Sequence, residues 1–277
     1  MTQRSILITG CSSGIGLDAA RGLRARGWRV FASCRQEADC ARMRAEGFDA
    51  PRIDYTEPAS IRAGLDVVLA QTGGTLDALF NNGAHATPGA VEDLPVEALR
   101  EIFEANVFGW HALTRMAIPV MRAQGHGRIV NHSSVLGYVT LRWRGAYTAT
   151  KFATEGLTDT LRQEMADTPI RVITLNTGPV TSRIRANSIP HFERWIDWQH
   201  SARAAQYSDT LLKRLYAEGG PPDRFELPPS AVTAKLIHAI EAANPRPRYY
   251  ITTLSYLMAG ARRLLPTRAL DWLVTRV

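Results

Sequence analysis

The chain has 277 residues, of which 45% are hydrophobic and 21% charged, a balance typical of a folded globular protein rather than a disordered one. The formal net charge of +7 comes mostly from arginines scattered along the sequence, without the basic and aromatic stripe of a nucleic-acid-binding surface. No stretch approaches the roughly 20 apolar residues that a transmembrane helix needs. We therefore expect a protein with neither a nucleic-acid partner nor a transmembrane segment.

Short β-rich runs alternate with helix-length segments along most of the chain. Strands are expected at residues 5–9, 29–33, 50–54, 76–81, 128–133, 171–176 and 248–252. Helices are expected at residues 14–26, 96–124, 147–167 and 230–243. Several of the strand runs lack polar alternation, as parallel strands covered on both faces do. This pattern predicts one α/β domain over residues 1–277, with a doubly wound parallel sheet of seven strands.

Two late segments depart from this alternation. Residues 181–229 are rich in aromatic side chains and contain no clear strand, so we interpret them as a substrate lid. Residues 254–277 are predicted to be an amphipathic helical tail broken at Pro266. The tail could lie on a membrane surface or form a helical cap beside the lid, and we favour the cap.

The cysteines and the start of the chain bear on the compartment. Cys11, Cys34 and Cys40 are an odd number without metal-ligand spacing, as expected for reduced thiols. Residues 1–4 run directly into the first predicted strand, which leaves no room for a signal peptide. We expect a cytoplasmic protein.

Three glycines follow the first strand and open the first helix. Gly10, Gly14 and Gly16 would turn the chain, let backbone amides approach a pyrophosphate and allow close packing of helix on strand, as in a dinucleotide site. The second strand ends at Arg35, and no acidic residue follows before Glu37. An arginine suits the 2′-phosphate of NADP, whereas an acid would hold the ribose hydroxyls of NAD. We predict NADP over NAD; the alternative is that Arg35 is a solvated surface residue.

Several polar residues recur in the order that one family uses. They are the Thr9-Gly10-x-x-x-Gly14-x-Gly16 turn, Asp54, Asn81-Asn82-Gly83-Ala84, Asn106, Ser134, Tyr147, Lys151 and Asn176-Thr177-Gly178-Pro179-Val180-Thr181. Over nearly its whole length the chain thus resembles the single-domain branch of the short-chain dehydrogenase/reductase family. Within it, the chain is similar to bacterial NADP-dependent aldehyde and ketone reductases and to hydroxysteroid dehydrogenases. The resemblance implies a Rossmann-type sheet, a nicotinamide cofactor and a homodimer or homotetramer.

The resemblance also assigns roles to residues. Cofactor contacts fall on Gly10, Ser12, Ser13, Gly14, Ile15, Gly16, Arg35, Asp54, Asn82, Tyr147, Lys151, Pro179, Val180 and Thr181. Lys151 would hold the nicotinamide ribose and Asn106 would support a water relay behind it. Thr181 would bind the nicotinamide carboxamide, although it could instead cap the next helix. The chain departs from the family in reading Asn-Asn-Gly-Ala for Asn-Asn-Ala-Gly, and in carrying Thr177 where a proline is usual.

Ser134, Tyr147 and Lys151 form the predicted catalytic set. Tyr147 and Lys151 are four residues apart and share one helix face. A phenol with a pKa of about 10 is a poor catalyst at neutral pH, but a nearby ammonium and an oxidised nicotinamide would lower that value. Tyr147 would give its proton to a carbonyl oxygen as hydride reaches the carbon, while Ser134 holds the same oxygen.

These residues predict an NADP(H)-dependent enzyme that reversibly reduces an aldehyde or ketone with an apolar body. The same chemistry leaves open a steroid or retinoid alcohol dehydrogenase, and a different class, a non-catalytic nicotinamide sensor, is the third interpretation. Ser134, Tyr147, His85, Phe192 and Trp195 are the candidate substrate contacts. The histidines match no zinc spacing, so no metal is expected. They include His85, His132, His191 and His200.

Overall fold

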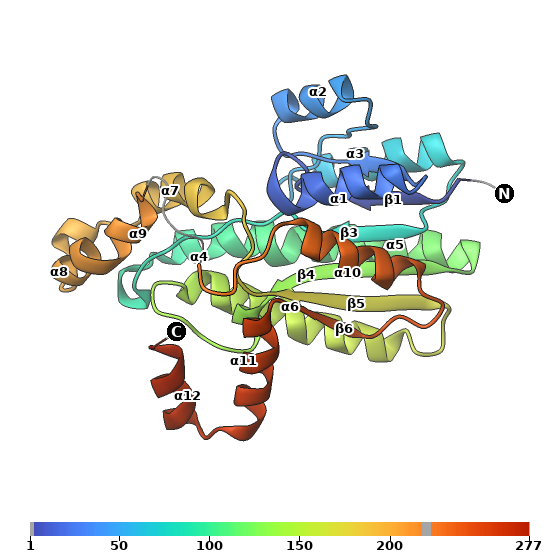
Figure 1. Ribbon diagram of the computed structural model, residues 1–277. Coiled ribbons are helices and arrows are strands. Elements are labelled where there is room, and N and C mark those ends of the chain that lie inside the picture. Colours follow the sequence, from blue (N-terminus) through green and yellow to red (C-terminus); the bar gives the residue numbers. More distant parts are fainter. Residues whose placement is uncertain (1–2, 218–222, 277) are drawn as a thin grey trace.

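The computed structural model describes residues 3–217 and 223–276. Its centre is one parallel sheet of six strands in the order β2-β1-β3-β4-β5-β6 (Figure 1). The strands are β1 (Ser5–Ile8), β2 (Arg29–Ala32), β3 (Ala78–Asn81), β4 (Gly127–Ser134), β5 (Ile170–Thr177) and β6 (Arg248–Ile251). The chain leaves β1 for β2 on one side and then returns to β3 on the other. Ligands of open α/β sheets bind at the carboxyl ends of the strands beside such a switch in direction.

The expected strand at residues 50–54 does not form, so the sheet has six strands instead of seven. The segment touches the edge of the sheet only at two isolated parallel bridges, which join Phe31 to Asp49 and Cys34 to Arg52. Pro51 lies between the two bridges and has no N–H to donate to a ladder. This segment with a proline at the edge of the sheet therefore becomes an extended connection.

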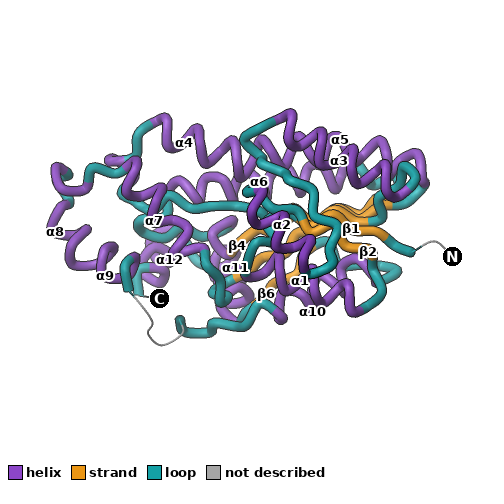
Figure 2. Tube along the Cα trace, turned by 90° about the horizontal axis from the view of Figure 1, so that it is seen from above, coloured by secondary structure: helices purple, strands orange, loops and turns teal. Residues whose placement is uncertain are grey.

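Helices cover both faces of the sheet, as expected of a doubly wound fold. On one face lie α1 (Gly14–Ala25) and α10 (Ser230–Glu241), and on the other α3 (Pro58–Thr72), α5 (Gly109–Gln124) and α6 (Gly145–Glu164) (Figure 2). Ile6 and Ile8 of β1 join the core beneath α1 and α10, whereas Leu7 joins the core beneath α3 and α5. Because alternate side chains enter different cores, Ile6, Leu7 and Ile8 follow one another without polar alternation.

The predicted helix at residues 96–124 is continuous but irregular. It comprises α4 (Val96–Phe103), a π-helical stretch η2 (Glu104–Phe108) and α5. Asn106 sits inside the π-helical stretch, a distortion that often accompanies functional sites.

The predicted lid segment is helical and lies beyond the carboxyl ends of the strands (Figure 1). It contains α7 (Ile184–Trp195), η4 (Trp198–His200), α8 (Ala204–Gln206), the π-helical η5 (Tyr207–Leu212) and α9 (Lys213–Leu215). Its apolar side chains form a separate small core with Ala90, and Tyr207 is fully buried there. The Tyr207 hydroxyl donates to Asp93 at 2.8 Å and accepts from the Ala90 N–H at 2.8 Å, which fastens the segment to the loop after β3. The absence of strand structure in the described part of this segment agrees with the prediction.

The tail forms α11 (Thr253–Leu264) and α12 (Thr267–Val274), separated at Pro266 as predicted. Met258, Leu270 and Val274 pack against Val139, and the Tyr138 hydroxyl donates to the Ser255 carbonyl at 2.8 Å. The tail is thus a helical cap over the turn that follows β4. The other elements are the helix α2 (Glu37–Ala45) and the short 3-10 turns η1 (Val91–Asp93) and η3 (Val135–Gly137). Among the described residues, no helix combines the length and apolar character needed to cross a membrane.

Candidate active site

The glycine turn between β1 and α1 fits a dinucleotide. Gly10 and Gly14 adopt φ values of +69° and +55°, which disfavour any residue with a side chain. A Cβ on Gly10 would lie 2.6 Å from the Cα of Gly83, and a Cβ on Gly16 would lie 2.3 Å from the Gly10 carbonyl oxygen. Ser13 is extended at the N-terminus of α1 and leaves the first helical N–H groups uncapped by a side chain. The bare backbone and open helix end form the cradle that a pyrophosphate needs.

The close contact between Gly10 and Gly83 bears on the Asn-Asn-Gly-Ala departure. A methyl group on Gly83 would meet Gly10 N at 3.3 Å, which is tight but needs only a small shift. Ala84, where the family has glycine, is exposed and does not have a positive φ. With glycine at position 83 and alanine at position 84, the contact between residue 83 and Gly10 is looser than in the family pattern, and the backbone is not strained.

Arg35 and Asp54 flank the predicted adenosine site. The Arg35 side chain is exposed and makes no hydrogen bond or ion pair with any described residue. Glu37, the next acidic residue along the chain, forms an ion pair with Arg44. The Asp54 carboxylate accepts from the Thr56 N–H at 3.0 Å and from its hydroxyl at 2.8 Å, which orients the carboxylate at the end of the extended connection.

A buried histidine links the ends of three strands, and the sequence did not assign it a role. The Nδ1 of His132 lies 2.9 Å from Asn82 Oδ1, and its Nε2 lies 3.1 Å from Thr177 Oγ1. Burial lowers the pKa of His132 to about 3, so the ring is neutral and can donate to the amide oxygen and accept from the hydroxyl. Asn82 also donates to the Thr9 carbonyl at 2.9 Å. Thr177, the second departure from the family, thus pairs with His132. Thr177, His132 and Asn82 form a hydrogen-bonded brace that reaches the glycine turn at Thr9.

The loop after β5 returns toward the same turn. A Cβ on Gly14 would lie 3.5 Å from the Cβ of Ser182, so this loop passes directly over the start of α1. Thr181 does not cap α7, whose N-cap is Arg183, and its hydroxyl donates to Glu226 at 2.6 Å. Pro179 and Val180 lie in the same loop and are partly buried. The loop is close enough to the glycine turn to bear on a cofactor bound there.

Ser134 and Tyr147 meet at the carboxyl edge of the sheet. Ser134 ends β4 and its Oγ accepts from the Leu136 N–H at 3.1 Å, while Tyr147 lies in the first turn of α6. Burial raises the pKa of the Tyr147 phenol, and Arg144 and the Ser134 hydroxyl act in the opposite direction. In the chain itself, desolvation of the phenolate outweighs the nearby positive charge of Arg144. Tyr147 is therefore protonated at neutral pH and available as a proton donor. The lowering of this pKa by Lys151 and a bound oxidised nicotinamide stays a prediction.

Lys151 lies one turn further along α6 and is buried, with 2% of its surface exposed. Its Nζ donates to the His132 carbonyl at 2.7 Å, lies 4.5 Å from the centre of the Trp110 ring and 5.4 Å from that of Tyr147. Burial lowers the pKa of Lys151 to about 7, and Glu155 opposes the shift. The amine shares the face of α6 with Tyr147, as the four-residue spacing predicts.

Asn106 is held by hydrogen bonds on both sides of the π-helical stretch. Its Oδ1 accepts from the His85 N–H at 3.1 Å, and its Nδ2 donates to the His85 carbonyl at 2.9 Å. Nδ2 also lies 3.3 Å from Thr150 Oγ1, which itself donates to the Tyr147 carbonyl at 2.7 Å. The asparagine therefore ties the loop after β3 to the helix that carries Tyr147.

Arg144 is a site residue that the sequence reasoning missed. It is the N-cap of α6, three residues before Tyr147, and it makes no ion pair with the described residues. Burial lowers the pKa of Arg144, and Arg214 and Arg185 add to this effect. Its position one helical turn before a candidate catalytic tyrosine is the signal that could have found it.

The predicted substrate contacts occupy different environments. His85 is buried beside Asn106, at the border of the site. Phe192 is 1% exposed and packs inside the lid core near Tyr207, so the structure places it in the support of the lid rather than on an open surface. Trp195 is half-buried, and its indole N–H is buried without a hydrogen-bond partner among the described residues.

A largely apolar cavity of about 930 Å³ opens beside the first turns of α6. Its lining includes Ala90, Trp143, Thr148 and Phe152. The Trp143 ring also packs against Tyr207 of the lid core, with the ring centres 4.6 Å apart and the planes tilted by 46°. The cavity adjoins the turn of α6 that carries Tyr147, but Tyr147 and Ser134 are not among its lining residues.

Comparisons with known proteins agree with this architecture. A family model described as short chain dehydrogenase matches residues 4–191. The chain is 36% identical over 269 residues to YbbO of Escherichia coli (strain K12), described as an uncharacterised oxidoreductase, covering 97% of this chain and 93% of that protein. It is 27% identical to an NADPH-dependent 3-dehydrocapnine reductase of Ornithobacterium rhinotracheale, covering 97% and 95% of the two chains. A short-chain dehydrogenase/reductase from Burkholderia phymatum, solved in complex with NAD, aligns with a TM-score of 0.77 and 25% identity, covering 94% and 92%. Family model, relatives and fold together show that this chain belongs to the short-chain dehydrogenase/reductase family of oxidoreductases.

Proposed function

We propose that this protein is an NADP(H)-dependent carbonyl reductase that acts reversibly on an aldehyde or ketone with an apolar body. The observation that carries the proposal is the position of the Tyr147 phenol in the first turn of α6, beside Ser134 and Lys151. A phenol that is protonated at neutral pH can deliver a proton to a carbonyl oxygen, and positive charge beside it stabilises the phenolate that remains.

The roles follow from the positions of the side chains. When bound, the reduced nicotinamide supplies the hydride, and the chain's own residues do the rest. Tyr147 donates its proton to the substrate oxygen, and Ser134 donates a hydrogen bond to that oxygen and orients it. Lys151 and Arg144 place positive charge near the phenolate that proton transfer leaves behind. Asn106 joins the loop after β3 to α6 through its hydrogen bonds to His85 and Thr150.

The choice of NADP rests on Arg35. Its guanidinium is exposed and has no partner among the described residues, while Glu37 is occupied by Arg44. The site therefore offers a positive charge for a 2′-phosphate and no free acid for ribose hydroxyls. The name of the Ornithobacterium rhinotracheale relative, which specifies NADPH, supports the same choice.

An apolar substrate body is supported by the cavity beside α6 and by the aromatic lid. The wall of the cavity is mostly apolar, and apolar pockets gain affinity by burying ligand surface. The 3-dehydrocapnine reductase named above is a relative whose substrate name denotes a keto compound.

We also propose that the protein self-associates through α5 and α6 and works in the cytoplasm. Phe108 and Leu157 expose 52% and 48% of their surfaces on or beside these two helices, and this apolar surface supports an interface. All three cysteines are unpaired and buried, as suits a reducing compartment.

The test is a panel of aldehydes and ketones, each assayed with NADPH and NADH and ranked by kcat/KM. We expect NADPH to be preferred, and Arg35→Ala to lower kcat/KM with NADPH by about tenfold or more while leaving NADH almost unchanged. The matched control is Arg21→Ala, which removes a different exposed arginine that is paired with Glu46. An Arg35→Ala enzyme that keeps full NADPH preference would refute the cofactor assignment. Cofactor binding without turnover of any carbonyl would favour a nicotinamide sensor.

A further inference from the structure

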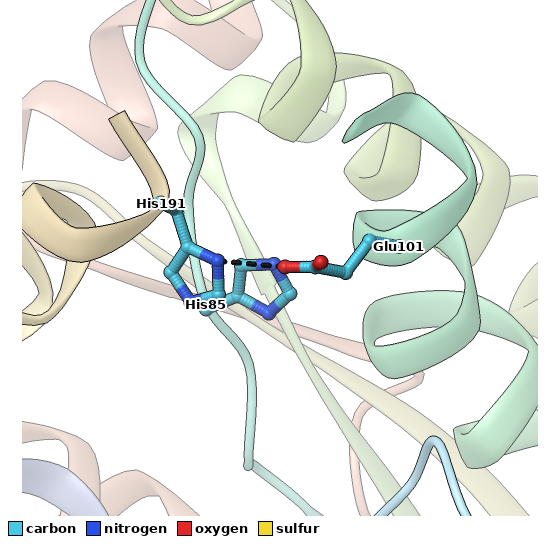
Figure 3. Close-up of side chains that lie close together, drawn as sticks. All are labelled: His85, Glu101 and His191. Carbon is cyan, nitrogen blue, oxygen red and sulfur yellow. Dashed lines mark hydrogen bonds and ion pairs between the residues drawn. The ribbon is translucent and has the colours of Figure 1, made fainter. Parts of the chain in front are cut away.

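Three elements far apart in the sequence bring two imidazoles and a carboxylate together. His85 comes from the loop after β3, Glu101 from α4 and His191 from the lid helix α7 (Figure 3). The Nδ1 of His191 lies 2.8 Å from Glu101 Oε1, and the rings of His85 and His191 stack with their centres 3.9 Å apart. One potential ligand atom from each residue lies within 4.8 Å of the other two.

The His85 ring points to a ligand because it lacks a partner. The residue is only 8% exposed, and its Nε2 is buried without a hydrogen bond to any described residue. Buried polar atoms are nearly always satisfied, so such an atom in a native fold needs an explanation. A bound cation would provide one.

We propose that His85, Glu101 and His191 form a binding site for a divalent transition-metal ion, with zinc as the best match. Two imidazoles and one glutamate are the protein ligands of known zinc sites that keep a fourth position for water. Calcium and magnesium prefer sets made of oxygen ligands, so the two imidazoles disfavour them.

The present geometry defines the movement that binding requires. Zinc-to-ligand distances of about 2.0–2.1 Å place tetrahedral ligand atoms about 3.3 Å apart. The potential ligand atoms now lie within 4.8 Å of one another, which is wider than a bound zinc ion allows. The planes of the His85 and His191 rings are within 13° of parallel, so their in-plane lone pairs do not point to a common position. Asn106 fixes the backbone of His85 on both sides. The adjustment therefore falls on His191 and α7, which would turn and draw closer to α4.

The surroundings of Glu101 both help and limit the site. Arg194 donates to Glu101 Oε2 at 3.0 Å and leaves Oε1 directed toward His191. Such an outer contact orients a ligating carboxylate. The positive charge of Arg194 also repels a cation, so we expect modest affinity, with a Kd on the order of micromolar, rather than that of a permanent structural site.

Binding would fasten the lid to the body of the enzyme. The metal would join α7 to α4 and to the loop that Asn106 holds, and so restrict opening of the predicted lid. This inference does not depend on the identity of the substrate or the cofactor, although one of the three ligands, His85, is also a candidate substrate contact.

The experiment titrates Zn²⁺ into the full chain and measures binding with a competing chromophoric chelator. We expect one ion per chain and a loss of affinity of at least about tenfold in His191→Gln and in Glu101→Gln. The matched control is His200→Gln, a fully solvated histidine of the same segment that pairs with Asp197, and we expect it to bind as the wild type does. Circular dichroism and an unchanged unfolding midpoint verify that the variants fold.

A second measurement follows amide hydrogen exchange in residues 184–195. Zn²⁺ should slow this exchange in the wild type and leave it unchanged in His191→Gln. The proposal is overturned if the wild type binds no zinc, or if both ligand variants retain wild-type affinity. The latter result would place the ion elsewhere, for example at the thiols of Cys34 and Cys40.

Discussion

Replacing His132 with isoleucine tests the buried brace between the strand ends. The substitution replaces the imidazole with an apolar side chain of similar volume and removes the hydrogen bonds to Asn82 and Thr177. Thr177 retains the Ser133 carbonyl, 3.3 Å away, as an acceptor, whereas Asn82 Oδ1 loses the one partner that the structure gives it. Stranding one buried acceptor costs about 1–3 kcal/mol. Since Asn82 is only partly buried, we expect the free energy of unfolding to fall by about 1–2 kcal/mol.

The brace should also influence the cofactor site, because Asn82 donates to the Thr9 and Gly10 carbonyls at 2.9 and 3.4 Å. We therefore expect NADPH to bind several-fold more weakly to His132→Ile, measured by fluorescence titration alongside urea unfolding. The control is His126→Ile, directly before the amino end of β4, where the ring Nε2 lies 2.7 Å from Asp77 Oδ1. An unfolding free energy within about 0.5 kcal/mol of the wild type, together with unchanged NADPH affinity, would refute the reasoning.

Three further predictions concern the turn, the buried amine and the interface. Gly16→Ala places a Cβ against the Gly10 carbonyl and should weaken NADPH binding at least about tenfold, whereas Gly260→Ala, which meets nothing within 4 Å, should not; equal affinities would contradict the cradle. The pKa of Lys151 is about 7 in the folded chain and about 10.4 when unfolded. Between these two pH values the unfolded chain binds more protons than the folded chain does. The difference in unfolding free energy between the wild type and Lys151→Met should therefore rise from pH 7 to pH 9, by up to about 1.4 kcal/mol per pH unit. Denaturant unfolding that shows no change in this difference with pH would exclude the shifted pKa of Lys151. Leu157→Glu should lower the mass measured by light scattering if α5 and α6 form the interface, and an unchanged oligomer would place the interface elsewhere.

The sequence predicted those features that depend on neighbours along the chain. Strand runs such as residues 171–176 and helix signals such as the residues after Gly14 lie within a few residues of the observed elements, because burial on two faces and glycine turns leave local patterns. The shared face of Tyr147 and Lys151 follows from helical geometry alone. The missing strand at residues 50–54 shows the limit, since this segment meets the edge of the sheet at only two bridges and Pro51 between them cannot donate to a ladder.

The remaining features depend on contacts between distant segments. The sign of the Tyr147 pKa shift is set by how deeply the fold buries the phenol, and its spacing from Lys151 does not reveal that depth. His85 and His191 have no zinc-like spacing, yet α7 brings their rings together. Thr177 is a departure from the family in the sequence, and its meaning emerges only beside His132. Such pairings are tertiary, and one sequence does not encode them in a local pattern.

The central claim is that the Tyr147 hydroxyl delivers the proton during carbonyl reduction. Single-turnover reduction of the best carbonyl substrate by NADPH-loaded Tyr147→Phe tests it most directly, with cofactor affinity measured on the same sample. The account predicts that NADPH binding changes by less than about threefold while the rate of hydride transfer falls by about 10²-fold or more. Hydride transfer at the wild-type rate in Tyr147→Phe would contradict it.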